Sequence, residues 1–467
     1  MKKILPPLVL ALCVFTVSIV AQRYTLLLQE CDGLFLMAPD YFRWAFGQTF
    51  PVSQIVSDFV VQFYRLWPSA PFIVAGIVCL VFLLVRGIIR KTPLRSSLLP
   101  MAAAVCVWLV MALNGATKPG VAAILCLLPV WIISLFFRKR TPGRREWLLP
   151  PTLDLIASSV LALAAGLLIS FNPGVRGAED WARVKNAAVY AKWPALEKAV
   201  SPELATRSHE FTPFGLLALD AQHQLGSRMF TYPVYEENDL DMCDEEDYYN
   251  SIFFRATLHS WMGCHNEAIH NYSQLACGVP HGTSFMVLRK LISENYLIGN
   301  YVLVEKYCKI LDRSQTHGKF TAFYRDAMGK GAPHAADSLA FRTSVPVITH
   351  TPSHNLMLLL SNGFPSVNIL DRLLCTFMLR RELDRFRGVL DTYGGRLSEL
   401  PVHHQEALAI ADPSCLDELS ESVRSRYRRF MEAFSSGADF SSLESGFGNT
   451  YWWYYYSWRS RQVVETQ

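Results

Sequence analysis

Residues 71–89 read PFIVAGIVCLVFLLVRGII, an apolar run whose single charged residue is Arg86. A helix needs about 20 such residues to cross the roughly 30 Å hydrocarbon core of a bilayer. Four further runs in the first part of the chain are similarly apolar: residues 4–21, 98–113, 121–137 and 148–171. The sequence therefore predicts a transmembrane domain over residues 1–172 with about five membrane-spanning helices.

The distribution of basic residues predicts the orientation of these helices. Lysines and arginines precede the first run and occupy the connections after the second and fourth runs: Lys2, Lys3, Arg90, Lys91, Arg95, Arg138, Lys139, Arg140, Arg144 and Arg145. The turn 114–120 carries only Lys118. Because short connections rich in Lys and Arg stay in the cytoplasm, we expect a cytoplasmic N-terminus. The loop 22–70 and everything after residue 172 are then expected outside.

The overall composition indicates a chain of two unlike parts. Its 467 residues are 51% hydrophobic, and the mean hydropathy is +0.19. An apolar membrane part and a more polar tail, residues 173–467, would average to these values. The formal net charge of +4 comes largely from the connections between the spans, and the tail has no basic stripe of the kind that binds nucleic acid. We therefore expect no nucleic-acid partner.

The tail contains a pattern typical of tetratricopeptide repeats. Ala256 has the place of the small residue on the first helix, Gly263 that of the turn, and Ala268 and Tyr272 those of the residues that fill the interface of the helix pair. Such repeats have a period of about 34 residues and combine two helices per unit. The pattern predicts two packed helices around Gly263.

The pattern recurs in the next stretch of the chain. Ile292 precedes a second turn at Gly299, and Val304 and Cys308 follow it at helical spacing. Further stretches have apolar residues with a period near 3.6: residues 355–360, 369–379, 383–393, 403–411 and 423–434. We find no convincing alternating strand pattern. The sequence thus predicts an all-α protein whose tail is a tetratricopeptide-like α-solenoid, a class of fold that binds proteins along its concave face.

Several motifs resemble those of an uncharacterised multi-pass membrane protein family of Bacteroidota. They are Leu27–Leu36, Asp40–Phe42, Ser57–Tyr64, Ser227–Phe230, Gly299–Tyr301, Glu305–Tyr307 and Asn449–Tyr455. The resemblance extends over nearly the whole chain. It implies a bacterial inner-membrane protein with a periplasmic tetratricopeptide-like region. The family has no assigned activity, so the resemblance implies no catalytic residues.

The first external loop contains the acidic residues that are candidates for chemistry. Glu30, Asp32 and Asp40 lie beside aromatic residues just after the first run. In membrane glycosyltransferases that use lipid-linked donors, acidic residues of this loop hold a metal or act as a base. The alternative is a set of solvated carboxylates that cap helices. Further along, residues 53–66 have an apolar stripe that predicts an amphipathic helix, lying at the membrane interface or packed on the bundle.

The C-terminal end is unusually aromatic. Its aromatic residues are Tyr451, Trp452, Trp453, Tyr454, Tyr455, Tyr456 and Trp458. Aromatic side chains with a polar tip favour the membrane interface, and they also stack on sugars. A solenoid, however, needs a cap over its last helix pair, and we interpret these residues primarily as that cap.

The sequence indicates no cofactor and no metal site. It lacks a phosphate-binding loop, a nucleophile elbow and a zinc-protease helix. The neighbours His403 and His404 have no ligand close in sequence. Two pairs of tail cysteines are candidates for a disulfide, Cys264 with Cys308 and Cys243 with Cys277.

Topology, repeats and the absence of a catalytic motif together favour one functional class. We expect a membrane-anchored scaffold whose external repeat domain binds protein partners of a cell-envelope complex, in contact with the lipid bilayer. The alternative is a membrane glycosyltransferase-like enzyme that acts on a lipid-linked sugar through Glu30, Asp32 and Asp40. The sequence identifies neither the protein partner nor any small-molecule or glycan ligand.

Overall fold

The computed structural model describes seven stretches of the chain: residues 4–90, 94–136, 146–242, 248–279, 282–330, 352–362 and 367–457. In these stretches the fold is all-α, apart from a two-residue parallel pairing of β1 (Leu94–Arg95) with β2 (Glu146–Trp147). The chain forms two compact units, each assembled from segments that are distant in sequence. The all-α prediction is therefore confirmed.

The first unit combines residues 1–186, 276–293 and 301–331. Its helices are α1 (Leu5–Val20), α2 (Arg23–Asp32), α3 (Pro39–Phe46), α4 (Pro51–Val61), the 3-10 helix η1 (Gln62–Arg65), α5 (Ser69–Ile89), α6 (Leu98–Leu113), α7 (Lys118–Phe136), α8 (Pro151–Phe171), most of α9 (Pro173–Val189), the first part of α17 (Phe285–Leu297), α18 (Tyr301–Leu311) and α19 (Gly318–Gly329). The five apolar runs of the sequence all form helices, with ends close to the predicted ones.

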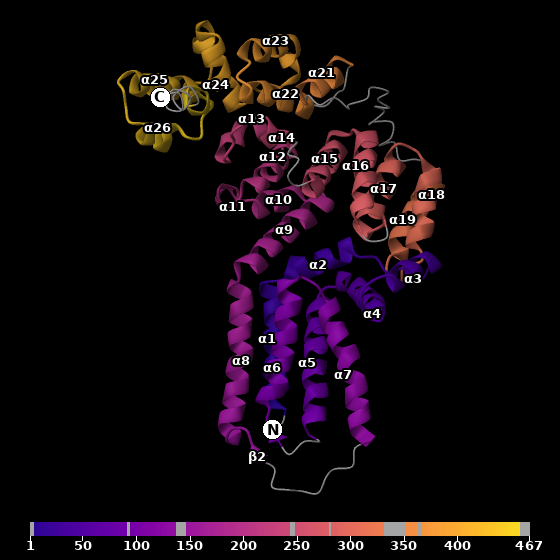
Figure 1. Ribbon diagram of the computed structural model, residues 1–467. Helices are drawn as coiled ribbons and strands as arrows, with labels where there is room; N and C mark the ends of the chain where they lie inside the picture. Colours follow the sequence, from indigo (N-terminus) through magenta and orange to yellow (C-terminus); the bar gives the residue numbers. More distant parts are fainter. Residues whose placement is uncertain are drawn as a thin grey trace. The chain divides into compact units, whose positions relative to one another are not determined.

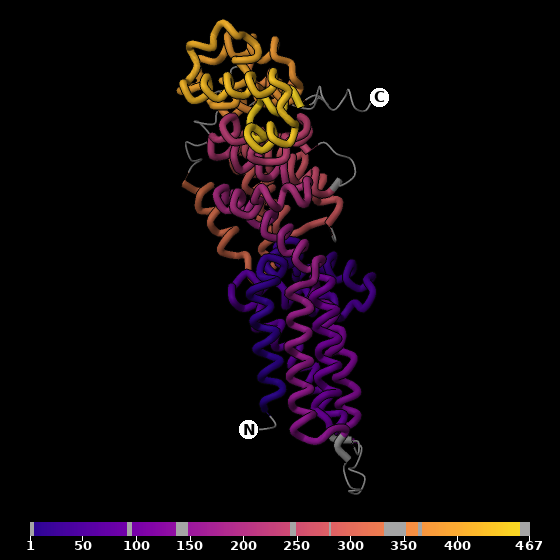
Figure 2. The backbone as a smooth tube through the Cα atoms, turned by 90° about the vertical axis from the view of Figure 1, so that its left-hand side faces the viewer, coloured from indigo at the N-terminus to yellow at the C-terminus, as the bar shows by residue number. Residues whose placement is uncertain are grey.

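Helices α1, α5, α6, α7 and α8 lie side by side as a bundle (Figures 1 and 2). Helix α5 packs against α1, α6 and α7, and α8 packs against α1 and α6. Three of these helices, α5, α7 and α8, are long and apolar enough to cross a membrane. The bent pair α1 and α2 adds a fourth candidate span if it is counted as one, and α6 is a shorter apolar helix. These helices indicate a membrane protein.

A buried carboxylate ties two bundle helices together. Asp154, in the first turn of α8, is 1% exposed. Its carboxylate accepts hydrogen bonds from the Ser96 hydroxyl at 2.9 Å and from the Ser97 backbone N–H at 2.7 Å. The first N–H groups of a helix have no partner within it, and a carboxylate there is favoured by the helix dipole. Asp154 therefore caps α6, a role that its place in the sequence did not reveal.

The loop helices α2, α3 and α4 lie at the end of the bundle opposite the start of α1 (Figure 1). Helix α2 turns away from α1 by 76°, and we describe it with the loop. Its N-terminus is capped by Glu179 of α9, whose carboxylate accepts from the backbone N–H groups of Tyr24 and Thr25, each at 2.9 Å. The loop between α1 and α5 is thus held by the segment that follows the last bundle helix.

The second unit combines residues 187–275, 294–300 and 332–467. Its elements are α10 (Trp193–Ala199), α11 (Pro202–Arg207), η2 (His209–Phe211), α12 (Thr212–Asp220), α13 (Leu225–Arg228), η3 (Met229–Thr231), α14 (Asn238–Asp241), α15 (Tyr248–Met262), most of α16 (His265–Gly278), α21 (Pro352–Ser361), α22 (Val367–Leu379), α23 (Leu383–Tyr393), η5 (Gly394–Arg396), α24 (Val402–Ala411), η6 (Pro413–Glu418), α25 (Glu421–Ser435) and α26 (Phe440–Phe447). From α21 to α26 each α-helix packs against the next one in the chain.

The interior of this second unit contains a buried arginine. Arg372 of α22 is fully buried, and its Nη1 lies 2.7 Å from a carboxylate oxygen of Asp220, which is 1% exposed. Its Nη2 donates to the backbone carbonyl of Leu240 and lies 3.8 Å from Asp241. Burial raises the pKa of Asp220 to about 6, although Arg372 opposes this shift. The guanidinium thus joins α22 to α12 and α14.

Replacing this arginine should destabilise the second unit strongly. We expect Arg372→Met to lower the free energy of unfolding by about 3–5 kcal/mol, because it leaves two carboxylates buried without their cation. Denaturant unfolding of the detergent-solubilised chain, followed by tryptophan fluorescence, measures the loss. Arg387→Met is the matched control, since Arg387 makes a 2.7 Å ion pair with Asp412 but is 46% exposed. That variant should lose less than about 1 kcal/mol, and equal losses in the two variants would contradict the prediction.

Candidate functional site

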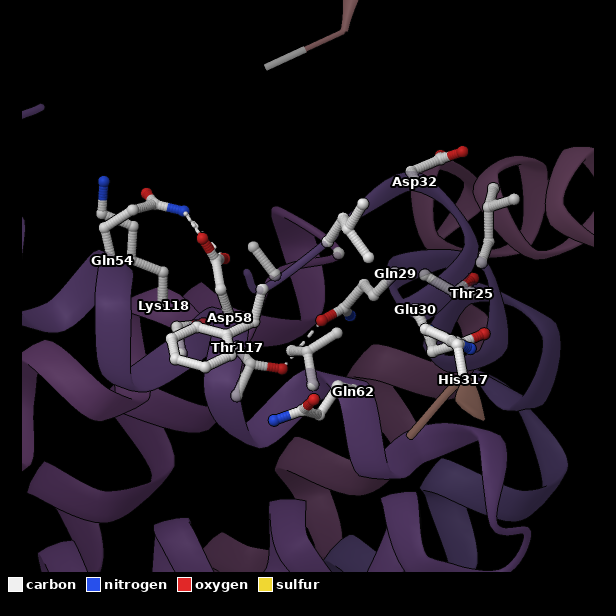
Figure 3. A pocket seen from close by; sticks show the side chains of 18 residues that line it. Thr25, Gln29, Glu30, Asp32, Gln54, Asp58, Gln62, Thr117, Lys118 and His317 are labelled. Carbon is white, nitrogen blue, oxygen red and sulfur yellow. Dashed lines mark hydrogen bonds and ion pairs between the residues drawn. The ribbon is translucent and has the colours of Figure 1, made fainter. Parts of the chain in front are cut away.

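A cavity of about 420 Å³ lies in the first unit, where α2, α4 and the turn between α6 and α7 meet (Figure 3). Both apolar and polar residues line it. Its lining residues are Thr25, Leu28, Gln29, Glu30, Asp32, Gly33, Leu34, Phe35, Gln54, Ser57, Asp58, Val61, Gln62, Gly115, Ala116, Thr117, Lys118 and His317. Concave sites with mostly apolar walls and a few placed polar groups are typical ligand sites.

Glu30 is the most unusual residue of this cavity. It is 3% exposed, and its Oε1 has no hydrogen-bond partner among the described residues. The nearest basic group is His317, whose Nε2 lies 3.4 Å from that oxygen. Because the Arg65 guanidinium donates to His317 Nδ1 at 2.9 Å, the ring proton of a neutral His317 is on Nε2, the nitrogen nearer to Glu30. A buried polar atom without a hydrogen bond calls for an explanation, such as a catalytic role or a bound water or ion.

Burial shifts the proton affinities of these two groups in opposite directions. It raises the pKa of Glu30 to about 7, against the opposing effects of Arg65, Cys31 and Arg289. Burial, with Arg65 and Arg289, lowers the pKa of His317 to about 3. The imidazole is therefore neutral near neutral pH, while Glu30 is about half protonated. A carboxyl group with a pKa near the working pH is suited to general acid–base chemistry.

The other two predicted acidic residues are placed differently. Asp32 also lines the cavity, and burial raises its pKa to about 6, with Lys185 opposing. Its carboxyl group points away from that of Glu30 (Figure 3), because residues two apart on a helix lie on different faces. Asp40 does not line the cavity. Its side chain is 83% exposed and pairs with Arg43 at 3.3 Å, as expected for a solvated carboxylate.

The opposite wall of the cavity is a network that the sequence did not reveal. Asp58 accepts from the Tyr41 hydroxyl at 2.8 Å and from the Gln54 amide at 2.9 Å. In the α6–α7 turn, the Thr117 hydroxyl donates to Gln29 at 2.8 Å. Burial raises the pKa of Asp58, although its hydrogen bonds with Gln54 and Tyr41 oppose the shift. These bonds fix the positions of polar groups that would meet a ligand.

The predicted interfacial helix, residues 53–66, corresponds to α4 and η1. Its polar side is turned inward, since Ser57 and Gln62 are each 4% exposed and line the cavity. The apolar stripe is partly open, with Phe59 41% exposed. Such a helix can present apolar side chains to a membrane interface while its polar side faces the cavity.

The predicted repeat residues are in the core and in turns. Gly263 and Gly299 have φ angles of +80° and +75°, which favour glycine. The six other predicted positions are fully buried: Ala256, Ala268, Tyr272, Ile292, Val304 and Cys308. The helix pairs α15–α16 and α17–α18 flank the two glycine turns.

The C-terminal aromatics are largely buried in the second unit. Tyr451 and Trp452 are fully buried, Trp453 is 8% and Tyr454 is 7% exposed. Trp452 Nε1 donates to the Glu406 carbonyl at 3.0 Å, and the Tyr454 hydroxyl donates to the Leu379 carbonyl at 2.8 Å. Tyr455 is half-buried, and Trp458 lies outside the described residues. Buried rings are unavailable to a sugar or a bilayer, so their burial favours the cap.

Cys264 and Cys308 are buried thiols that do not form a disulfide. The first of the two candidate disulfides is therefore not formed. Cys243, one member of the second candidate pair, lies outside the described residues, whereas Cys277 is exposed.

The fold and the cavity define an all-α membrane protein with a polar site beside its candidate spans. The chain matches one family model over residues 1–214 and again over residues 178–457. It therefore belongs to that family, which is described as a family of unknown function (DUF6057). Comparisons with curated proteins and with solved structures found no match.

Replacing Glu30 should change how stability depends on pH. In the folded chain its pKa is about 7 instead of the usual 4.5, so folding favours the protonated form. That stability is complete below about pH 4.5 and is lost as the pH rises through 7. We expect the stability of Glu30→Gln not to fall in this way. Its free energy of unfolding should therefore rise, relative to that of the native chain, by up to about 3 kcal/mol between pH 4.5 and pH 8.

Thermal unfolding in detergent across this pH range measures the effect. Asp40→Asn is the control and should leave the pH profile unchanged, since Asp40 is exposed. Parallel profiles for the native chain and Glu30→Gln would rule out the raised pKa.

Proposed function

We propose that this protein is a membrane-anchored scaffold of the bacterial inner membrane, whose periplasmic tetratricopeptide-like region binds protein partners of an envelope complex. The observation that carries the proposal is the series of helices α21 to α26, each packed against the next in the chain. Successive packing of this kind builds extended binding surfaces in helical-repeat proteins. The buried residues and glycine turns around Gly263 and Gly299 support the same interpretation.

A five-span arrangement would put the tail outside the cytoplasm. The start of α1 and the C-terminal ends of α5 and α7 lie at one end of the bundle (Figure 1). Basic residues of the sequence cluster next to these three ends, which favours the cytoplasm for this side. The proposal counts α1 and the short α6 as spans along with α5, α7 and α8. It also leaves α2 to α4 at the outer interface.

One labelling experiment tests orientation and partner binding together. Val302 of α18 is 81% exposed, so Val302→Cys should accept a membrane-impermeant maleimide that carries a photo-crosslinker. In spheroplasts we expect labelling above that of the native chain, which reports the background of native thiols such as Cys277. Illumination should then crosslink the labelled chain to the same protein partner in repeated experiments.

The two failures of this experiment are distinguishable. Labelling that appears only after the membrane is opened would overturn the external placement. Labelling in spheroplasts without any crosslinked protein, at this position and at Phe323→Cys on α19, would overturn the scaffold. Phe323 is 64% exposed and offers an independent site.

The cavity favours a second candidate, a glycosyltransferase-like enzyme that acts on a lipid-linked sugar. Two observations favour it: one oxygen of Glu30 has no hydrogen bond among the described residues, and the pKa of Glu30 is about 7. In this reaction Glu30 would accept the proton of an acceptor hydroxyl. The hydroxyl oxygen would then bond to the anomeric carbon as the bond to the lipid phosphate breaks. Lys118, which lines the cavity, could neutralise the departing phosphate.

This second candidate predicts a loss of glycan product without a loss of protein. Glu30→Gln keeps the size of the side chain but removes the base, so we expect product formation to fall about 100-fold or more. The measurement compares envelope polysaccharide and membrane levels of the protein between the native strain and the variant. Asp40→Asn should behave as the native chain. A normal polysaccharide profile in Glu30→Gln would exclude the enzyme.

A further inference from the structure

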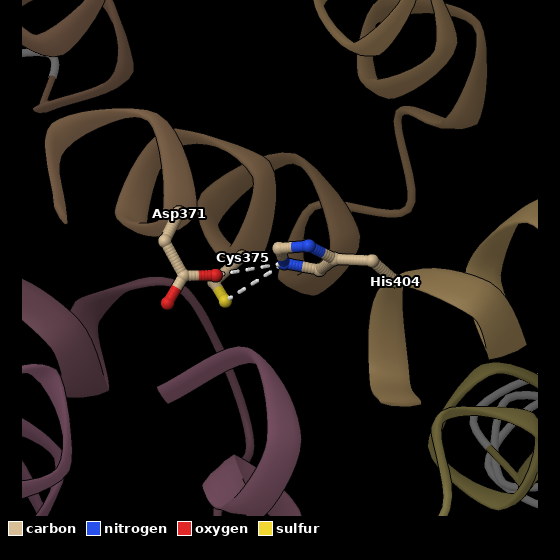
Figure 4. A group of neighbouring side chains, drawn as sticks. All are labelled: Asp371, Cys375 and His404. Carbon is tan, nitrogen blue, oxygen red and sulfur yellow. Dashed lines mark hydrogen bonds and ion pairs between the residues drawn. The ribbon is translucent and has the colours of Figure 1, made fainter. Parts of the chain in front are cut away.

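Three potential metal ligands meet in the interior of the second unit (Figure 4). Asp371 and Cys375 lie one turn apart on α22, and His404 comes from α24. His404 and Cys375 are fully buried, and Asp371 is 7% exposed. The ligand atoms all lie within 4.8 Å of one another. Because the residues come from different helices, their spacing in sequence gives no metal-binding motif.

The contacts distinguish this group from a catalytic triad. His404 Nε2 lies 3.2 Å from Asp371 Oδ1 and 3.6 Å from Cys375 Sγ. In a nucleophilic triad the nucleophile and the carboxylate use different ring nitrogens. Here both face the same nitrogen, so the carboxylate is not placed to orient the ring for proton transfer from the thiol.

The same distances fit a tetrahedral metal. Zinc binds carboxylate oxygen and imidazole nitrogen at about 2.0–2.2 Å and thiolate sulfur at about 2.3 Å. At tetrahedral angles, these bonds separate oxygen from nitrogen by about 3.3 Å and sulfur from nitrogen by about 3.6 Å. The observed separations, 3.2 Å and 3.6 Å, agree with both values.

The surroundings of the Asp371 carboxyl group also favour a bound cation. Asp371 Oδ1 has no hydrogen-bond partner among the described residues, although the other oxygen accepts from the Gly226 N–H at 3.2 Å. The nearby guanidinium of Arg372 is engaged with Asp220.

Gly226 leaves room beside the donor atoms. A Cβ at this position would lie 2.5 Å from Asp371 Oδ1 and 2.9 Å from His404 Nε2. Any side chain would therefore enter the space on which the ligands converge.

We propose that Asp371, Cys375 and His404 bind a divalent transition metal of the zinc class. The thiolate, imidazole and carboxylate donors suit zinc. On binding, the Cys375 thiol gives its proton to solvent, and the sulfur, Nε2 and Oδ1 donate to the metal. The site connects α22 with α24, so a bound metal would stabilise the packing of these two helices.

Metal analysis of the full-length chain tests the proposal. The protein is purified in detergent without chelators, incubated with Zn²⁺ and freed of unbound metal by gel filtration. We expect about one zinc per chain and a higher melting temperature, because a metal that binds the folded state stabilises it. Substitution by Co²⁺ should add a sulfur-to-cobalt charge-transfer absorption.

Variants assign the metal to these residues. Cys375→Ser and His404→Gln should each lower the affinity by at least 10-fold, and Gly226→Ala should do so by filling the space. Cys264→Ser is the matched control, since Cys264 is another fully buried free thiol, and it should retain the metal. A native chain that holds no stoichiometric zinc and gives no thiolate–cobalt absorption overturns the proposal, whatever the stability of the variants. Metal retained by folded Cys375→Ser would also overturn it.

Discussion

The requirement that polar groups find partners away from water governs this molecule. Inside a bilayer a helix satisfies its backbone internally, but its first turn needs help from elsewhere. Asp154 supplies that help to α6 by accepting from Ser96 and Ser97. The carboxylate that caps one helix belongs to another, so the cap also fixes how α6 and α8 pack. An apolar bundle with few polar contacts then supports a loop region that can hold a polar cavity.

Three buried acids illustrate three outcomes of the same constraint. Asp220 has a cationic partner, Arg372, at one of its two oxygens, and we expect this pair to stabilise the second unit. Asp371 accepts from one backbone N–H and lies beside the Cys375 thiol and the His404 imidazole, so it is suited to bind a cation from solution. Glu30 has a neutral imidazole at 3.4 Å and an oxygen without a partner, so it is suited to exchange a proton or meet a ligand. Burial is common to all three, and the neighbouring charges distinguish their roles.

The sequence predicted what depends on local pattern. The apolar runs were sufficient to predict the bundle helices. The stripe in residues 53–66 predicted α4, and the turn glycines predicted two helix pairs. It placed Glu30 in the important loop but could not separate it from Asp40, because the difference is burial by distant segments. His317 lies far along the chain from Arg65, and no spacing rule connects them. The same holds for His404 with Asp371, and the stripe in residues 53–66 did not show that the polar side of α4 lines the cavity.

The cap on α2 has a consequence for biogenesis. Glu179 holds Tyr24 and Thr25, yet it is synthesised only after the last bundle helix, α8. His317, which completes the wall beside Glu30, is made later still. At about 5–20 residues per second, the early loop waits several seconds or more for its closing residues. A nascent chain that ends before these residues would therefore have the bundle helices but an incomplete cavity.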